Sequence, residues 1–216
     1  MPNREHHKKR AWLFDLDDTL IKTLQTKTRA IQYTGEKYYG VKIPSVRIRS
    51  LWGAPFPKLM SMLFPSDADL NEVIAHYTAE RSRFPSPAYP NTVRTLKKLS
   101  MHDDVGIVTS HTRVYIRSDL ESARIPESLF FHIQTYEDTE FHKPDPRVFD
   151  PAIEACIARG IQRENIRYVG DSLIDHEASV GAGIEFIGIY GHTAPKETFD
   201  HLGIRAIGDI KELETI

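Results

Sequence analysis

The stretch AWLFDLDDTL (residues 11–20) places four uncharged residues directly before three acidic side chains, Asp15, Asp17 and Asp18. The run 11–14 is typical of a strand buried on both faces of a parallel sheet. Such sheets bind ligands beyond the carboxyl ends of their strands, where Asp15 lies. In extended geometry Asp15 and Asp17 project to the same side, whereas Asp18 points elsewhere and is expected to fix the turn.

Two carboxylates held this close together require compensation of their negative charge. A cation between them, a shared proton or a cage of hydrogen bonds would each provide it. The alternative is an acidic N-cap without any ligand, in which Asp18 or Thr19 caps the following helix. The residues at the other strand ends bear on this choice, and they favour a ligand.

Further short apolar runs predict additional strands, with helical repeats between them. One such repeat is an apolar stripe that includes Cys156 and indicates a helix packed on the core. Strands that alternate with helices predict an α/β fold, a Rossmann-like parallel sheet with helices on both faces. The expected strands cover residues 11–14, 105–109, 130–135, 166–170, 184–190 and, as a shorter sixth, 204–208.

One long interval between the first two strands breaks this alternation and reads as a helical insertion. Apolar spacing predicts three helices in it, over about 23–39, 56–63 and 70–77. The prolines of FPSPAYP (84–90) mark the return of the chain, since they fit neither a helix interior nor a central strand. We therefore expect two domains, an α/β core and a small helical domain, comprising residues 1–20 with 88–216 and residues 21–87.

Two of the later strand ends carry groups that suit an anion. The second strand runs into Thr109 and Ser110, whose hydroxyl and backbone N–H groups before a helix form a natural anion cradle. Ser and Thr also cap helices without binding anything. Lys143 stands ahead of two prolines in HKPDP (142–146), which stiffen the turn and would aim the lysine inward. An ordinary surface lysine is the alternative.

A third strand end supplies further acids in GDSLIDHEAS (170–179). Asp171 and Asp175 are four residues apart, which is about one turn of a helix. Asp171 would complete an oxygen-ligated metal site, for which Mg²⁺ is the expected ion. The alternative is that both acids are favoured only by the dipole of the helix that begins there.

Taken in order, the motifs FDLDDTL, VTS, KPDP and GDSLIDHEAS resemble those of the haloacid dehalogenase-like hydrolases, in particular the phosphoglycolate phosphatase-like branch. The resemblance covers essentially the whole chain. It implies a Mg²⁺-dependent phosphatase that hydrolyses a small phosphorylated metabolite through an aspartyl-phosphate intermediate. It also implies that residues 21–87 are a cap domain. A sugar-phosphate mutase or a pyrophosphatase on the same core remains open, as does a non-catalytic binding or regulatory module.

The resemblance also implies a role for each matching residue. Asp15 would be the nucleophile, and Asp17 the general acid that later serves as base. Thr109 and the backbone at Ser110 would hold the phosphoryl group, and Lys143 would neutralise its charge.

The implied Mg²⁺ site draws on the same motifs. Asp15, the backbone carbonyl of Asp17 and Asp171 would bind the ion, and Asp175 would support it directly or through water.

Other side chains near the motifs have less specific expectations. His111 and His142 flank motif residues and are expected to be hydrogen-bonding neighbours. In the helical insertion, four residues are either substrate contacts or ordinary core and surface residues: Arg47, Arg49, Trp52 and Phe56.

The composition is that of an ordinary globular protein, with 216 residues and a net charge of −2. This small negative charge does not indicate nucleic-acid binding. No apolar run approaches the roughly 18 residues of a membrane span. The basic start REHHKKR (4–10) is read as a solvated tail, and no signal peptide is expected. The single cysteine, Cys156, precludes an internal disulfide and fits a cytoplasmic protein. The sequence leaves the oligomeric state open.

Overall fold

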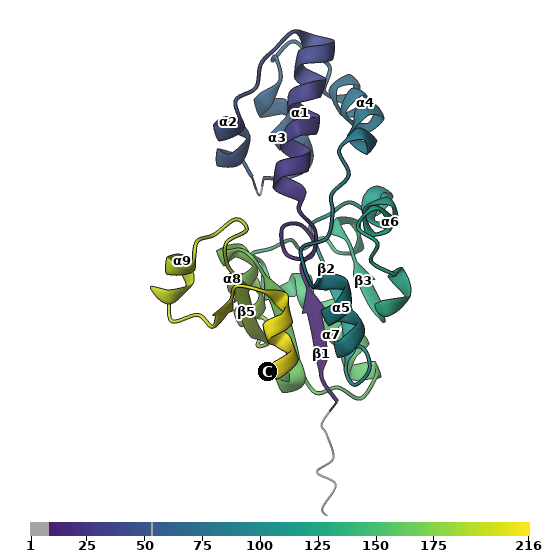
Figure 1. Ribbon diagram of the computed structural model, residues 1–216, viewed down its shortest axis with the longest axis vertical. Coiled ribbons are helices and arrows are strands. Elements are labelled where there is room, and N and C mark those ends of the chain that lie inside the picture. Colours follow the sequence, from purple (N-terminus) through teal and green to yellow (C-terminus); the bar gives the residue numbers. More distant parts are fainter. Residues whose placement is uncertain (1–8, 53) are drawn as a thin grey trace, which may run out of the picture. The chain divides into compact units, whose positions relative to one another are not determined.

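The computed structural model describes residues 9–52 and 54–216, and this part of the chain contains one parallel sheet of six strands (Figure 1). The order β3-β2-β1-β4-β5-β6 puts β1 between β2 and β4. The α/β prediction is confirmed, and each expected strand is present, two of them with the predicted ends and four with slightly different ends. The strands are β1 (Ala11–Phe14), β2 (Asp104–Val108), β3 (His132–Gln134), β4 (Ile166–Gly170), β5 (Glu185–Ile189) and β6 (Ala206–Ile207). The expected N-terminal tail falls largely on residues 1–8, outside the described part.

Both faces of the sheet are covered, which explains the uninterrupted apolar run of β1. Trp12 and Phe14 belong to one buried cluster, together with residues of α5, α6 and the C-terminal turn η6. Leu13 belongs to a second cluster, together with residues of α7, α8 and α9. Cys156 is fully buried in this second cluster, as its apolar stripe predicts. The helices are α5 (Thr92–Leu99), α6 (Arg113–Ser122), α7 (Asp150–Ala158), α8 (Leu173–Gly181) and α9 (Lys196–Asp200).

Short 3₁₀ turns link several of these elements. They are η1 (Arg81–Arg83), η2 (Glu127–Leu129), η3 (Tyr136–Asp138), η4 (Pro146–Phe149), η5 (Arg163–Asn165) and η6 (Ile210–Thr215). Among the described residues, none of the helices combines the length and the apolar character needed to cross a bilayer.

The chain divides into two compact units, and the second, Lys22–Pro87, is entirely helical apart from its loops. Its helices α1 and α3 both pack against α2 and α4 around a buried apolar cluster. Ile21, fully buried, stays with the first unit, where it forms an antiparallel bridge to Ala88. The helices are α1 (Thr23–Tyr39), α2 (Ser45–Ser50), α3 (Phe56–Leu63) and α4 (Leu70–Glu80).

Several of the residues that the sequence left open between substrate contact and ordinary core or surface positions take part in the packing of the helical unit. Phe56 and Trp52 both pack against its apolar cluster, and the Phe56 ring lies 4.9 Å from that of Tyr77. The guanidinium of Arg47 donates to the backbone carbonyl of Met62 at 2.5 Å. These contacts agree with the core-and-surface interpretation of Phe56 and Arg47. Arg49 is exposed.

Candidate active site

The parallel register brings the carboxyl ends of the central strands together. Phe14 at the end of β1 pairs with Ile107 of β2 on one side and with Val169 of β4 on the other. Asp15 follows β1, and its backbone N–H donates to the carbonyl of Val169 at 2.9 Å. Thr109 therefore follows β2, and Asp171 follows β4, at the same edge of the sheet as Asp15.

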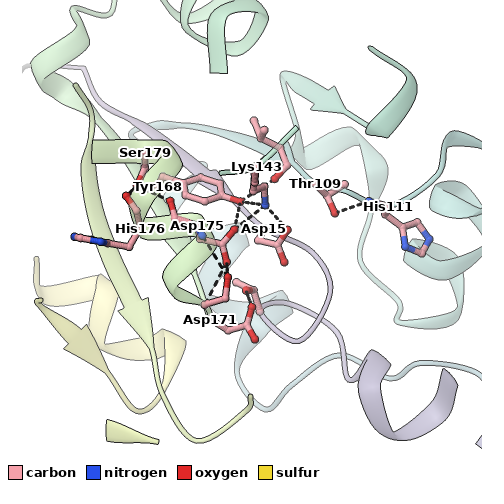
Figure 2. Close-up of polar contacts among 12 residues, drawn as sticks. Asp15, Thr109, His111, Lys143, Tyr168, Asp171, Asp175, His176 and Ser179 are labelled. Atoms are coloured by element: carbon pink, nitrogen blue, oxygen red, sulfur yellow. Dashed lines mark hydrogen bonds and ion pairs between the residues drawn. The ribbon is translucent and has the colours of Figure 1, made fainter. Parts of the chain in front are cut away.

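Lys143 is the central cation at this edge (Figure 2). Its ammonium donates to Oδ1 of Asp15 at 2.8 Å, to Oδ1 of Asp175 at 2.7 Å and to the hydroxyl of Tyr168 at 2.5 Å. Burial works to lower the pKa of Lys143, but the two carboxylates outweigh burial and raise it. The lysine therefore stays charged, and it points inward as the sequence predicted rather than lying on the surface.

Tyr168 is a member of the site that sequence reasoning missed. It lies fully buried in β4, and its hydroxyl sits 2.9 Å from the carbonyl of Val108 and 3.2 Å from Oδ1 of Asp175. A buried tyrosine hydroxyl requires a polar partner, so a tyrosine within an apolar strand was the available signal. The buried ring thus places its hydroxyl group beside the ammonium of Lys143.

Asp175 has a structural function as well as its contact with Lys143. It forms a capping box with Ser172 at the start of α8, where Oδ2 accepts from the Ser172 backbone N–H at 3.2 Å and from the hydroxyl at 2.6 Å. Gly170 permits this position, because a Cβ there would lie 2.7 Å from Cβ of Asp175. Both carboxylate oxygens of Asp175 are thus engaged within the protein.

Asp171 is buried and held by two hydroxyl groups from distant loops. Oδ1 accepts from Thr19 at 3.3 Å, and Oδ2 accepts from Thr193. The Thr193 hydroxyl also lies 3.1 Å from the backbone carbonyl of Asp171. Sequence reasoning found neither threonine as a partner: Thr19 was considered only as a helix cap, and Thr193 lies in a loop after β5 that carries no motif.

The site holds more negative than positive charge. Burial is the largest influence on the pKa of Asp15; together with repulsion from Asp175 and Asp17, it outweighs the attraction of Lys143 and raises this pKa to about 7. Burial, followed by repulsion from Asp175 and Asp15, raises the pKa of Asp171 well above its usual range. Carboxylates in such surroundings favour either protonation or an additional cation.

The donor chemistry of this cluster fits a divalent metal ion. Asp15 and Asp171 offer oxygen atoms and excess negative charge, which are the requirements of Mg²⁺. Within the described residues, no group of three acidic, histidine or cysteine side chains is arranged so that it could hold a metal ion. The carboxylates instead contact Lys143 and the two threonine hydroxyls. An ion would bind at the remaining lone pairs of these oxygens or replace one of these partners.

A second set of contacts surrounds the end of β2. The Thr109 hydroxyl oxygen accepts from the backbone N–H of His111 at 3.1 Å, so its proton is left to donate (Figure 2). Nδ1 of His111 lies 3.1 Å from Oδ2 of Asp17, which confirms His111 as a hydrogen-bonding neighbour of a motif residue. Ser110 is exposed. The ring of His142 stacks on Tyr136, with 3.7 Å between centroids.

The loop after β1 is fixed by Asp18, as expected, but not by capping a helix. Asp18 has a left-handed backbone with φ of 56°, its N–H donates to the carbonyl of Ile21 at 2.8 Å, and its carbonyl accepts from Nδ1 of His192 at 2.7 Å. Helix α1 begins only at Thr23, where the N-cap residue is Lys22 and no side chain caps the helix. The acidic N-cap interpretation of Asp18 or Thr19 is therefore wrong.

The chain is similar to known proteins over most of its length. The sequence model of the haloacid dehalogenase-like hydrolases matches residues 12–189. Pyrophosphatase PpaX of Oceanobacillus iheyensis is 28% identical over 179 residues, which cover 82% of this chain and 81% of the relative. Pyrophosphatase PpaX of Halalkalibacterium halodurans is 29% identical over 180 residues, which cover 80% of each chain.

Solved structures share the fold over nearly the full length. A protein from Bacteroides fragilis that is assigned as a haloacid dehalogenase-like hydrolase superposes with a TM-score of 0.78 at 26% identity, covering 95% of this chain and all of that one (100%). CbbY from Rhodobacter sphaeroides, solved in complex with phosphate, has the same fold with a TM-score of 0.78 at 18% identity, covering 95% and 96% of the two chains.

Proposed function

Because this chain belongs to the haloacid dehalogenase-like hydrolase family, we propose that it is a Mg²⁺-dependent phosphatase acting on a small phosphorylated metabolite through an aspartyl-phosphate intermediate. The observation that carries the proposal is the buried ammonium of Lys143, which lies between Asp15 and Asp175 where three strand ends converge. Such a cluster suits a reaction in which an anion must attack another anion.

Asp15 is the proposed nucleophile. One of its carboxylate oxygens attacks phosphorus, and the bond between phosphorus and the leaving oxygen breaks. Two unit charges of the same sign at 4 Å repel by about 4 kcal/mol at an effective dielectric constant near 20. Lys143 offsets this repulsion because its ammonium already contacts Oδ1 of Asp15.

Asp17 is the proposed general acid and base. In the first step its carboxyl group gives a proton to the leaving oxygen, and in the second it takes a proton from the water that attacks the phosphoryl group. The bond to Asp15 then breaks, phosphate leaves, and both carboxyl groups return to their starting state. The Thr109 hydroxyl and the backbone of Ser110 would hold the phosphoryl oxygens during both steps.

Asp15, the backbone carbonyl of Asp17 and Asp171 are the proposed ligands of Mg²⁺. When bound, the ion supplies positive charge that lowers the repulsion between the nucleophile and the phosphoryl group. Thr19 and Thr193 orient Asp171 for this task. Asp175 supports the site by holding Lys143, since both of its oxygens contact protein groups.

Pyrophosphatase activity is a second candidate, favoured by the names of the relatives that match about four-fifths of the chain. The proposed residues serve it equally, because the leaving oxygen then belongs to a second phosphate. A sugar-phosphate mutase would use the same residues but would keep the phosphoryl group, and a binding module would use none of them catalytically.

The helical unit 22–87 is the proposed cap that selects the substrate. The chain leaves the first unit at Ile21, four residues after Asp17, and returns at Ala88, which pairs with Ile21. An exposed cation such as Arg49 suits contact with an anionic substrate. Arg49→Ala is expected to raise KM for the natural substrate more than for p-nitrophenyl phosphate, and an equal effect on both would contradict this role.

The direct test is hydrolysis of p-nitrophenyl phosphate with and without Mg²⁺, followed by a screen of phosphoglycolate, sugar phosphates, nucleotides and pyrophosphate. Asp15→Asn is expected to abolish turnover. Asp17→Asn is expected to bind Mg²⁺ but to lose about 10²–10⁴-fold in rate. Full activity in either variant, or activity that is indifferent to Mg²⁺, would contradict the proposal.

A further inference from the structure

Two hydrogen bonds of its backbone hold His111 in place. Its N–H donates to the hydroxyl oxygen of Thr109 at 3.1 Å, and its carbonyl accepts from the backbone N–H of Tyr136 at 3.0 Å. The residue is only 5% exposed. The backbone of His111 is therefore fixed by two neighbouring strand ends, and the burial of the residue restricts movement of the ring.

The ring lies between two carboxyl groups. Nδ1 is 3.1 Å from Oδ2 of Asp17, and Nε2 is 2.9 Å from Oδ2 of Asp119. Asp119 is buried on α6, whereas the Asp17 side chain is partly exposed, as a group that meets substrate must be. The three side chains thus connect the buried face of α6 to the loop after β1.

We propose that His111 is a positioning residue for Asp17 and that Asp119 fixes the orientation of its ring. This inference rests on the proposed acid–base function of Asp17. A carboxyl group on a loop can rotate away from the leaving oxygen, and a buried hydrogen-bond partner restricts that rotation.

The chemistry of imidazole suits the first step of the proposed reaction. With its one N–H at Nε2 facing the carboxylate of Asp119, the neutral ring has the lone pair of Nδ1 facing Asp17. Nδ1 then accepts a hydrogen bond from the protonated carboxyl of Asp17 and holds the acid in place for proton transfer to the leaving oxygen. His111 itself gains and loses no proton in that step.

The measurement that tests this positioning function is the dependence of kcat/KM on the leaving group of the substrate. This constant covers the steps up to departure of the leaving group, so it reports how well Asp17 protonates the leaving oxygen. Ethyl phosphate has a poor leaving group that needs this proton. In p-nitrophenyl phosphate the leaving group is a stable anion that needs it far less. A ring with a merely structural function would affect both substrates equally.

His111→Gln and His111→Asn separate the two ring contacts. A glutamine amide reaches the place of Nε2 beside Asp119, whereas an asparagine amide lies close to the place of Nδ1 beside Asp17. We expect His111→Gln to lose between about 10-fold and 100-fold in kcat/KM on ethyl phosphate, as for partners that orient a reactive group, and less than about 3-fold on p-nitrophenyl phosphate. His111→Asn is expected to recover part of the loss.

Asp119→Asn tests the same inference while keeping the histidine in place. Asp119→Asn is expected to lose more kcat/KM on ethyl phosphate than on p-nitrophenyl phosphate, and the loss should be smaller than that of His111→Gln. His102→Gln and Glu121→Asn, both at exposed positions, are controls that should match the wild type on both substrates.

Equal losses on the two substrates in His111→Gln and Asp119→Asn, or no loss in either, would overturn the positioning function of His111. Failure of the proposed function looks different, because the wild-type protein itself would then hydrolyse neither phosphate.

Discussion

The ammonium of Lys143 donates a 2.8 Å hydrogen bond to Oδ1 of Asp15, although 128 residues separate them in the sequence. Neither side chain is more than 9% exposed, so water screens this pair little. The pair joins the end of β1 to the turn before η4. Asp175 shares the same ammonium, and Asp171 is a further buried acid that is repelled by Asp15 and Asp175, so negative charge is in excess at this edge of the sheet.

Lys143→Met removes the ammonium but keeps a long apolar side chain. We expect the free energy of unfolding to fall by about 3 kcal/mol, the low end for breaking a buried ion pair, because the carboxyl groups can take up protons instead. Turnover of p-nitrophenyl phosphate should be lost. Urea denaturation and steady-state kinetics measure the two effects.

The matched control is Lys98→Met. Lys98 pairs with Glu214 but is 51% exposed, so its loss should cost less than about 1 kcal/mol. A Lys143→Met protein with the stability and turnover of the wild type would show that the pair is not needed.

Gly170→Ala tests the close approach of Asp175 to the end of β4. The new Cβ would lie 2.7 Å from Cβ of Asp175, so the aspartate must move away from Ser172 and Lys143. We expect a loss of about 1–3 kcal/mol in unfolding free energy, as for overpacking elsewhere, together with slower turnover.

A double-mutant cycle with Asp175→Asn identifies the cause of that loss. If Gly170→Ala acts through Asp175, the two substitutions will be strongly non-additive in both stability and kcat. Additive effects would place the damage elsewhere in the strand.

The raised pKa of Asp15 predicts how pH affects stability without metal. Between its ordinary value of 3.8 and about 7, the folded state binds a proton that the unfolded state has released. The contribution of Asp15 to stability therefore falls as pH rises through this window. The raised pKa of Asp171 acts in the same direction.

Mg²⁺ competes with these protons, so its stabilising effect should depend on pH. We expect Mg²⁺ to raise Tm more at about pH 8 than at about pH 5, because at the lower pH the buried acids are already neutral. Thermal unfolding with and without Mg²⁺ measures the difference, and Asp171→Asn should remove it. Equal shifts at both pH values in the wild type would argue against a metal site built on these acids.

Much of the fold could be predicted from the sequence because burial on both faces leaves a clear pattern. Ala11–Phe14 and Ile166–Gly170 match the predicted strands residue for residue. The short strand His132–Gln134 differs more from the predicted 130–135, since Phe130 and Phe131 are apolar residues that pack against the clusters before the strand begins. Hydrophobicity alone does not separate such packing from strand pairing.

The site was only partly predictable, for a different reason. The acids lie in short motifs at strand ends, so the topology of a parallel sheet predicts their convergence, and the two prolines after Lys143 indicated a turn that aims it inward. Thr193 and Asp119 carry no local signal, because their function comes from contacts across the fold, and the signal for Tyr168 was only a tyrosine within an apolar strand. Asp175 shows the limit most clearly, since one side chain serves both a capping box and Lys143.

The most direct measurement of the central proposal is the covalent state of Asp15 during turnover. The wild-type protein and the slower Asp17→Asn variant are mixed with p-nitrophenyl phosphate and Mg²⁺, quenched in acid within the first turnover and reduced with borohydride, which converts an acyl phosphate to an alcohol. Peptide mass spectrometry is expected to find homoserine in place of Asp15. Phosphate on another residue, or turnover that leaves Asp15 unmodified in both proteins, would contradict the mechanism.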